Sequence, residues 1–470
     1  MHRLLILLKI PIILIGLSIG IVAPIMMEGF LALKNAQVAF DRKDFAESGA
    51  DYESAALRLT WRSELWEQAG ISYVNGKDWE DAERVFEIAR RQGGLSAEGW
   101  DMYGEGYLVN GNEGEAMEIW TAGLKEYPSY TGFYSDFALV YRDLKNYNEE
   151  QNALEIWLAT GKGTAIEHYE LGQLLMTSDP GRAFQELRNA SALDPEFYSV
   201  VQTLNASLDL AATESEPVQR LVIIGRGLGL VDEWGLASRA FEQAVNLDSG
   251  NAEAWSWLGE ARQHQGQDGK EELDKALSLD PQDTVVHALR GLYWKRQGLY
   301  TNALDEYQQA ADAEPENPTW QVSIGEISAL NGDLVSALGD YQKATSLAPN
   351  DAMYWRLLAM FCADNGVQVQ EVGLPAAQKA FEIAPNDPQA MDALGWSYLN
   401  AGYLYNAEQN LLKAIKAEPD LVLAHIHLAE TYLRKGDRPS AFVELNNVRQ
   451  LDPNGLSGQL AAQLLKQYFP

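Results

Sequence analysis

Residues 391–419 read MDALGWSYLNAGYLYNAEQNLLKAIKAEP, and the spacing of small residues in this stretch decides the fold. With Pro388 taken as position 1, Gly395 stands at position 8 and Ala407 at position 20. The next unit starts 34 residues later, at Val422, and has small residues at the same two positions, Ala429 and Ala441. A fixed period of this length predicts a repeat array.

The same spacing extends over most of the 470-residue chain. The unit at Ala252 is two residues short and the unit at Ala352 is two residues long, and both changes fall in predicted turns, where repeat arrays tolerate them. About twelve units are predicted, and they start at Gly29, Ser63, Ala97, Thr131, Ala165, Val218, Ala252, Thr284, Pro318, Ala352, Pro388 and Val422.

Each unit has the residues of two antiparallel helices. Small residues at positions 8, 20 and 27 allow close helix approach, and large residues at positions 4, 7, 11 and 24 fill the space between units. Gly366, Gly402 and Gly436 are expected to end first helices in the left-handed conformation. Prolines close the second helices, at Pro281, Pro315, Pro349, Pro419 and Pro453. No segment alternates with period two for long enough to predict a strand.

The unit from Ala97 has the most complete pattern, with Trp100, Tyr103, Gly104, Tyr107, Gly111, Ala116, Trp120, Gly123 and Pro128. This pattern resembles the tetratricopeptide repeat, and the resemblance covers residues 29–455. It implies an all-α, right-handed α-solenoid of about twelve helix-turn-helix repeats. The family binds proteins or peptides in a concave groove lined by the first helix of each repeat.

Breaks in the pattern suggest how the array is divided. We predict a first stack over 29–195, an irregular helix and polar linker over 196–217 that acts as a bend or a hinge, and a second stack over 218–455. The leucines of residues 456–470 fall on one helical face, which predicts a capping helix over the last repeat.

Residues 4–27 are the one segment of the chain whose composition is not that of a soluble protein. No charge interrupts the stretch from Ile10 to Met27, and 18 residues of helix span roughly 27 Å, close to the thickness of a bilayer core. Pro24 makes cleavage after Ala23 unfavourable, so residues 1–28 are predicted to be an uncleaved signal anchor, with a cleaved signal as the alternative. Arg3 and Lys9 favour an N-terminus in the cytoplasm and a single-pass protein whose array is extracytoplasmic.

Composition excludes several classes of function. The chain carries 36 Lys and Arg against 67 Asp and Glu, for a net charge of −31, which disfavours nucleic acid and anionic lipid as partners. Contact with a membrane is therefore expected only through the N-terminal helix. A single cysteine, Cys362, excludes an intramolecular disulfide framework and is expected to be a small core residue.

No motif predicts catalysis, a metal or a cofactor. His168, His287 and His425 stand at position 4, which tryptophan occupies in other units, so core packing is favoured over metal ligation. The segment ATGKGT at 159–164 lacks the leading glycine of a phosphate-binding loop. We therefore expect a protein that is not an enzyme and has no cofactor.

The resemblance places positions 2, 5, 9, 12 and 13 on the groove, and these positions change in charge along the chain. The early units are acidic there, which favours a basic partner segment, although a solvated acidic face is the alternative. The candidate partner-binding residues are Glu64, Glu67, Glu98, Asp101 and Glu105, then Arg226, Lys295, Arg296 and Arg356, and Trp396 as an aromatic anchor.

The sequence thus predicts a membrane-anchored scaffold that assembles an envelope complex by binding proteins or peptides. Two alternatives stay open. One is a cytoplasm-facing receptor or assembly factor, and the other is a glycan-handling or catalytic envelope protein with a site between the two stacks. The sequence sets neither the partner nor the oligomeric state.

Overall fold

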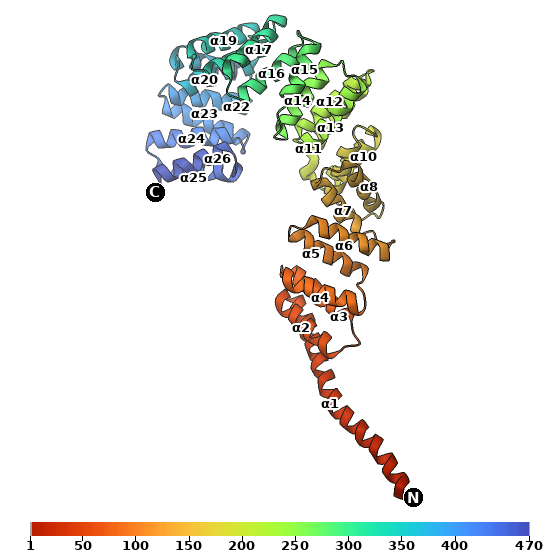
Figure 1. Ribbon diagram of the computed structural model, residues 1–470. Helices are drawn as coiled ribbons and strands as arrows, with labels where there is room; N and C mark the ends of the chain where they lie inside the picture. The colour runs from red at the N-terminus through yellow and green to blue at the C-terminus, as the bar shows by residue number, and fades with distance from the viewer. Residues whose placement is uncertain (1, 470) are drawn as a thin grey trace. The chain divides into compact units, whose positions relative to one another are not determined.

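The computed structural model describes the backbone of residues 2–469 and the side chains of residues 22–469. Within this part of the chain the regular structure is helical, with 26 α-helices and two short helical turns, η1 (Pro195–Phe197) and η2 (Val369–Gly373) (Figure 1). The chain divides into two compact units, Met1–Ala212 and Thr213–Pro470.

The first unit is built from eleven consecutive helices, the last of which ends at the boundary. Their bounds are α1 His2–Asp41, α2 Phe45–Arg58, α3 Glu64–Asn75, α4 Trp79–Gln92, α5 Ala97–Val109, α6 Glu113–Glu126, α7 Phe133–Asp143, α8 Tyr147–Leu158, α9 Ala165–Leu175, α10 Pro180–Leu193 and α11 Tyr198–Thr213.

The second unit contains the remaining helices. Their bounds are α12 Pro217–Leu230, α13 Trp234–Leu247, α14 Ala252–His264, α15 Lys270–Leu279, α16 Thr284–Arg296, α17 Tyr300–Ala313, α18 Pro318–Leu330, α19 Leu334–Leu347, α20 Ala352–Asn365, α21 Leu374–Ile383, α22 Pro388–Asn400, α23 Leu404–Ala417, α24 Val422–Lys435, α25 Arg438–Leu451 and α26 Leu456–Tyr468.

Consecutive helices pack in pairs in both units, from α1 with α2 to α24 with α25 (Figure 1). Only α11 and α26 stand outside this pairing among the described helices, and α26 packs on α25. The predicted all-α repeat fold is confirmed. The 26 helices correspond to about thirteen repeats rather than the twelve expected, because α11 and α26 add two helices to the twelve pairs.

The turns inside the pairs use the left-handed backbone conformation. Gly366, Gly402 and Gly436 have φ values of 65°, 88° and 78°, which confirms their prediction. At the equivalent turns of the first unit lysines adopt the same conformation, with φ values of 61°, 59° and 56° at Lys43, Lys77 and Lys145. The residue type therefore does not identify these turns in the sequence, although their regular spacing along the chain does.

The two irregular repeats differ in their turns, as predicted. In the short repeat, a Cβ on Gly269 would overlap the carbonyl group of Gly259, so the tight turn between α14 and α15 requires two glycine backbones in contact. In the long repeat, the extra residues form the π-helical turn η2, which follows Gln368 in the left-handed conformation.

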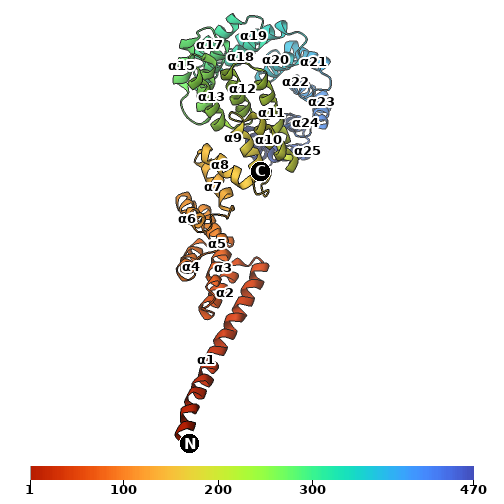
Figure 2. The same cartoon turned by 90° about the vertical axis from the view of Figure 1, so that its right-hand side faces the viewer.

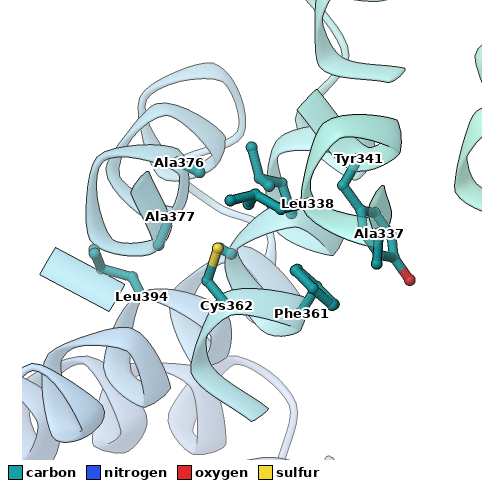
Figure 3. Close-up of a cluster of buried hydrophobic side chains, with 10 residues drawn as sticks. Ala337, Leu338, Tyr341, Phe361, Cys362, Ala376, Ala377 and Leu394 are labelled. Atoms are coloured by element: carbon teal, nitrogen blue, oxygen red, sulfur yellow. The ribbon is translucent and has the colours of Figure 1, made fainter. Parts of the chain in front are cut away.

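The core of the array consists of small residues facing large ones. Gly395 lies against the side chain of Leu411, as the repeat pattern predicts. Cys362 is fully buried in a cluster that joins α19, α20, α21 and α22, where Figure 3 shows it near Ala377 and Leu394. Burial raises the pKa of the Cys362 thiol to about 11, so the sulfhydryl stays protonated, and its predicted role as a core residue is confirmed.

The apolar N-terminal segment and the first helix of the array are one continuous helix, α1 (Figure 2). Within residues 22–469, no helix is both long enough and apolar enough to span a membrane. The predicted span over 4–27 lies mostly outside this range, because the side chains of residues 1–21 are not described.

Candidate partner-binding face

The first helices of successive pairs lie side by side and form one face of each unit. In the first unit α3 contacts α5, and in the second unit α12, α14 and α16 form one such series and α20, α22 and α24 another. We refer to this surface as the first-helix face. The ten candidate partner-binding residues all belong to first helices.

The histidines at position 4 are part of the packing between helices. Nε2 of His287 and Nε2 of His425 each lie 2.9 Å from the carbonyl oxygen six residues earlier, of Pro281 and Pro419. Trp355 makes the same contact with Pro349, also at 2.9 Å. Tryptophan and histidine are thus interchangeable at position 4 because both have a ring N–H that satisfies this carbonyl group.

These histidines also bind a carboxylate through their other ring nitrogen. Nδ1 of His287 lies 2.7 Å from Glu306, and Nδ1 of His425 lies 2.6 Å from Glu444. Since both nitrogens face acceptors, each ring needs two protons. The Glu306 hydrogen bond raises the pKa of His287. Burial is the largest influence on the pKa of His425 and lowers it, but the hydrogen bonds to Glu444 and to the Pro419 carbonyl, together with the charge of Glu444, outweigh it and the net shift is upward. Within the described residues, no group of three or more His, Cys, Asp or Glu could hold a metal ion.

Two of the five acidic candidates are already bound within the first unit. Glu64 forms an ion pair with Arg62 at 2.6 Å. Glu67 is buried, and its carboxylate accepts hydrogen bonds from the backbone N–H of Ser96 at 2.7 Å and from the Ser96 hydroxyl at 2.6 Å. Glu67 therefore joins α3 to the start of α5 and is not presented to solvent.

The other three acidic candidates lie together on α5, next to Asp136 of α7. Asp101 is half-buried, and Tyr130 donates a hydrogen bond to its Oδ2 at 2.8 Å. Burial and the nearby carboxylates of Asp101 and Glu105 together raise the pKa of Asp136 to about 8. Burial and Asp101 also raise the pKa of Glu105. Glu98 is exposed at the start of α5.

The carboxyl groups of Asp101 and Asp136 are coupled. Oδ1 of Asp101 is buried, and no N–H or hydroxyl group of the described residues donates a hydrogen bond to it. Hydrogen bonding to Asp101 is one of the causes that raise the pKa of Asp136, so Asp136 is the group that holds a proton at neutral pH. We refer to Glu98, Asp101, Glu105 and Asp136 as the acidic patch. Among the described residues, none of its four carboxyl groups forms a salt bridge.

Three of the four basic candidates are used in contacts between neighbouring repeats. Arg226 lies 3.7 Å from Glu253 and over the Trp257 ring, 5.1 Å from its centroid. Lys295 pairs with Glu326 at 2.6 Å, and Arg296 pairs with Glu260. The fourth, Arg356, is half-buried, and its Nε has no hydrogen-bond partner in the structure.

Trp396 is part of a network of side-chain contacts that connects three first helices. Its indole N–H donates a hydrogen bond to Asp364 of α20 at 2.7 Å, and its ring stacks on His427 of α24 with centroids 4.1 Å apart. His427 in turn binds Asp392 through Nδ1 at 2.8 Å, and both of these side chains are buried. Trp396 therefore contacts the two neighbouring repeats, and only part of its ring reaches the surface.

The structure thus brings three sequence candidates together, Asp101, Glu105 and Glu98, and disperses the others. Sequence reasoning missed Asp136, Tyr130, Asp364, Asp392 and His427. The contacts that involve them join residues 29 to 35 positions apart, which is about one repeat. Pairing complementary residues one repeat apart would have found them.

One pocket lies away from all of these residues. It has a volume of about 360 Å³ and is lined by Val74, Lys77, Trp79, Gly106, Val109 and Asn110, at the turn between α3 and α4 and the end of α5. Open and mixed in polarity, it contains no pair of groups arranged for acid–base chemistry.

Comparison with known proteins agrees with the repeat geometry. Residues 290–366 and residues 388–421 match tetratricopeptide repeat family models. The chain is 23% identical over 217 residues to a peroxisomal targeting signal receptor of Kluyveromyces lactis, covering 38% of each protein. It is 24% identical over 159 residues to a TPR repeat-containing protein of Pseudomonas aeruginosa, covering 34% of this chain and 27% of that protein. The chain thus spans well under half the length of these relatives.

Among solved structures, yeast Tom70 is similar over 93% of this chain and 95% of its own, with 14% identity and a TM-score of 0.43. The matched repeats include the stretch 391–419, whose small residues set the period. Residues 290–366 and 388–421 of the chain are thus tetratricopeptide repeats.

Proposed function

We propose that this protein is a scaffold whose acidic patch binds a basic segment of a partner protein. Tetratricopeptide proteins bind proteins and peptides and are typically non-enzymatic, which supports the general class. The observation that carries the specific proposal is the Asp101–Asp136 pair, two carboxyl groups on neighbouring first helices that form no salt bridge with any described residue.

A lysine or arginine side chain complements this arrangement. Two adjacent carboxylates repel one another, and the structure relieves that repulsion with a proton on Asp136. An incoming ammonium or guanidinium group also relieves the repulsion between the two carboxylates, because it brings a full positive charge and donates several hydrogen bonds. Glu98 and Glu105 at the surface add long-range attraction for a basic segment.

Neutral substitutions in the acidic patch test this proposal. The variant Asp101→Asn, Glu105→Gln and Asp136→Asn should lose most of its affinity for a fluorescent peptide of alternating lysine and alanine. The matched control is Glu113→Gln and Glu118→Gln on α6, which removes two negative charges from a second helix, as the test variant does at neutral pH, where Asp136 is protonated. Circular dichroism checks that both variants stay helical. Equal losses in the two variants would show general attraction by an acidic protein and would contradict the proposal.

We further propose that residues 1–28 anchor the chain in the cytoplasmic membrane, with the array extracytoplasmic and able to assemble an envelope complex. The uncharged run from Ile10 to Met27 and the cations Arg3 and Lys9 before it support this orientation. Reporters joined after residue 470 test it. Activity of a reporter that works only in the cytoplasm would favour a cytoplasm-facing receptor or assembly factor instead.

A further inference from the structure

The end of α2 and the turn that follows it expose large apolar side chains beside the end of the N-terminal apolar run. Leu57 is 61% exposed and Trp61 is 57% exposed. Arg58 of the same segment lies 3.3 Å from Glu28, the first charged residue after that run, and Gly29 lies directly against Leu59. The turn therefore sits at the level of α1 where apolar sequence gives way to polar sequence.

Residues of α1 at the same level are exposed and apolar as well. Phe30 and Leu31, which follow Glu28 and Gly29, are 49% and 59% exposed. With Leu57 and Trp61 they are exposed apolar side chains on two segments of the first unit. We refer to these four residues as the apolar edge. Exposed apolar side chains that gather on one part of a repeat indicate a site of contact with another apolar surface.

The position of the apolar edge favours a bilayer as its occupant. If residues 10–27 cross the hydrocarbon core, Glu28 stands at its boundary, and the α2–α3 turn beside Glu28 stands at the level of the lipid headgroups. Tryptophan is enriched at that depth because its ring is apolar and its N–H can reach a polar partner. The Trp61 indole N–H makes no hydrogen bond to another described residue, so it is available to a lipid carbonyl.

We propose that the apolar edge inserts into the headgroup region of the membrane that anchors the protein, so that the first repeat rests on the bilayer. This inference rests on the proposed anchor. Because α1 continues without a break from the apolar run into the first repeat, no linker separates the two. The helix and the apolar edge together fix the first repeat at the membrane surface.

The insertion is apolar rather than electrostatic. Arg58 is paired with Glu28 and hydrogen-bonded to Ser54, and Arg62 is paired with Glu64. Neither arginine is free to bind a lipid phosphate without losing an existing partner. Insertion should therefore be the same in phosphatidylcholine vesicles and in vesicles with added anionic lipid.

Site-directed fluorescence in phosphatidylcholine vesicles tests the proposal with the full chain. In a Cys362→Ala background, single cysteines replace Thr60, Ile25 or Tyr405 and carry an environment-sensitive fluorophore, while some lipids carry a nitroxide quencher near the headgroup. Labels at positions 25 and 60 should lose most of their emission, and the label at position 405, on α23 of the second unit, should keep it. Adding Trp61→Ser should reduce quenching at position 60 and leave position 25 unchanged.

The outcomes separate the two proposals. Quenching at position 25 without quenching at position 60 would overturn the apolar edge and leave the anchor intact. Loss of quenching at both positions would overturn the anchor as well. A label at position 60 that is shielded in a dimer, without quenching by lipid, would show that a second copy of the chain covers the edge. Stronger quenching at position 60 with anionic lipid would contradict apolar insertion.

Discussion

The two Nη atoms of Arg296 lie 2.7 and 2.6 Å from the two carboxylate oxygens of Glu260, across the contact between α16 and α14. The Glu260 side chain is 4% exposed and the Arg296 side chain is 34% exposed. His264 shares the same carboxylate, with Nε2 at 3.1 Å. A residue predicted to bind a partner therefore joins two repeats of the chain itself.

Arg296→Ala should lower the free energy of unfolding by about 3 kcal/mol, because it leaves a buried carboxylate without its main partner. Urea unfolding of the full chain, followed by circular dichroism, measures the effect. Arg356→Ala is the matched control on another first helix, since the Arg356 Nε has no hydrogen-bond partner to lose. Similar losses in the two variants would show that the side chains matter for packing and not for the ion pair.

Stability should depend on pH through His287 and His425. Both have a pKa raised above 6.5 in the folded chain, so their contribution is full below the unfolded value and is lost as pH rises through the folded value. Replacing the carboxylate partners, by Glu306→Gln and Glu444→Gln, should flatten the decline in melting temperature above pH 6.5. Glu371→Gln, at an exposed position in η2, should leave the decline unchanged.

Adding a methyl group should have opposite effects at two glycines. A Cβ on Gly104 would overlap the fully buried ring of Trp120, whereas a Cβ on Gly339, inside α19, meets no atom within 4 Å. We expect Gly104→Ala to destabilise the chain by about 1–3 kcal/mol through overpacking. Gly339→Ala should stabilise it by about 0.5–1 kcal/mol by reducing backbone freedom in the unfolded chain. Thermal unfolding compares the two, and a neutral Gly104→Ala would contradict the packing assigned to position 8.

Affinity for the lysine peptide should rise with pH. Below about 8 Asp136 holds a proton that the incoming cation must displace, and above that value the pair carries two negative charges. Titration of the peptide at several pH values from 6 to 9 measures the rise. Asp136→Asn should remove this dependence, while Glu115→Gln should keep it. A rise that persists in Asp136→Asn would place the titrating group elsewhere.

Asp136 has a second measurable effect, on folding. Its pKa is raised from 3.8 to about 8 by burial and by its acidic neighbours, so the folded chain holds a proton that the unfolded chain releases in between. Stability should therefore fall as pH rises across this range. Melting temperatures of Asp136→Asn and of the parent chain should agree at low pH and diverge in favour of the variant near neutrality.

The repeat pattern was readable because it depends on short-range sterics. Gly395 must be small for α22 to reach Leu411, and Gly366 must be glycine-like to end α20 with a positive φ. The turns at Lys43 and Lys77 show the limit of residue type as a signal, since lysine there adopts a backbone conformation that is usually left to glycine.

The candidate partner-binding residues were harder to predict from the sequence, because the exposure of a side chain at a groove position depends on the neighbouring repeat. Glu67 stands at a groove position but bonds to Ser96, and Trp396 bonds to Asp364. In the acidic patch, the raised pKa of Asp136 comes from burial and from Asp101 on another helix. None of these partners is adjacent in the sequence to the residue that it affects.

The sequence by itself determined the period, the helical class, the positions of the turns and the apolar run before the array, because each follows from side-chain size, backbone freedom or hydropathy within about one repeat. The tertiary structure decided which charges remain available. Packing of one first helix on the next neutralises Arg296 and buries Glu67, but it leaves Asp101 beside Asp136 with no salt bridge to a residue that the structure describes. The physical reason is that a charge is free or bound according to what the adjacent repeat places within hydrogen-bond distance.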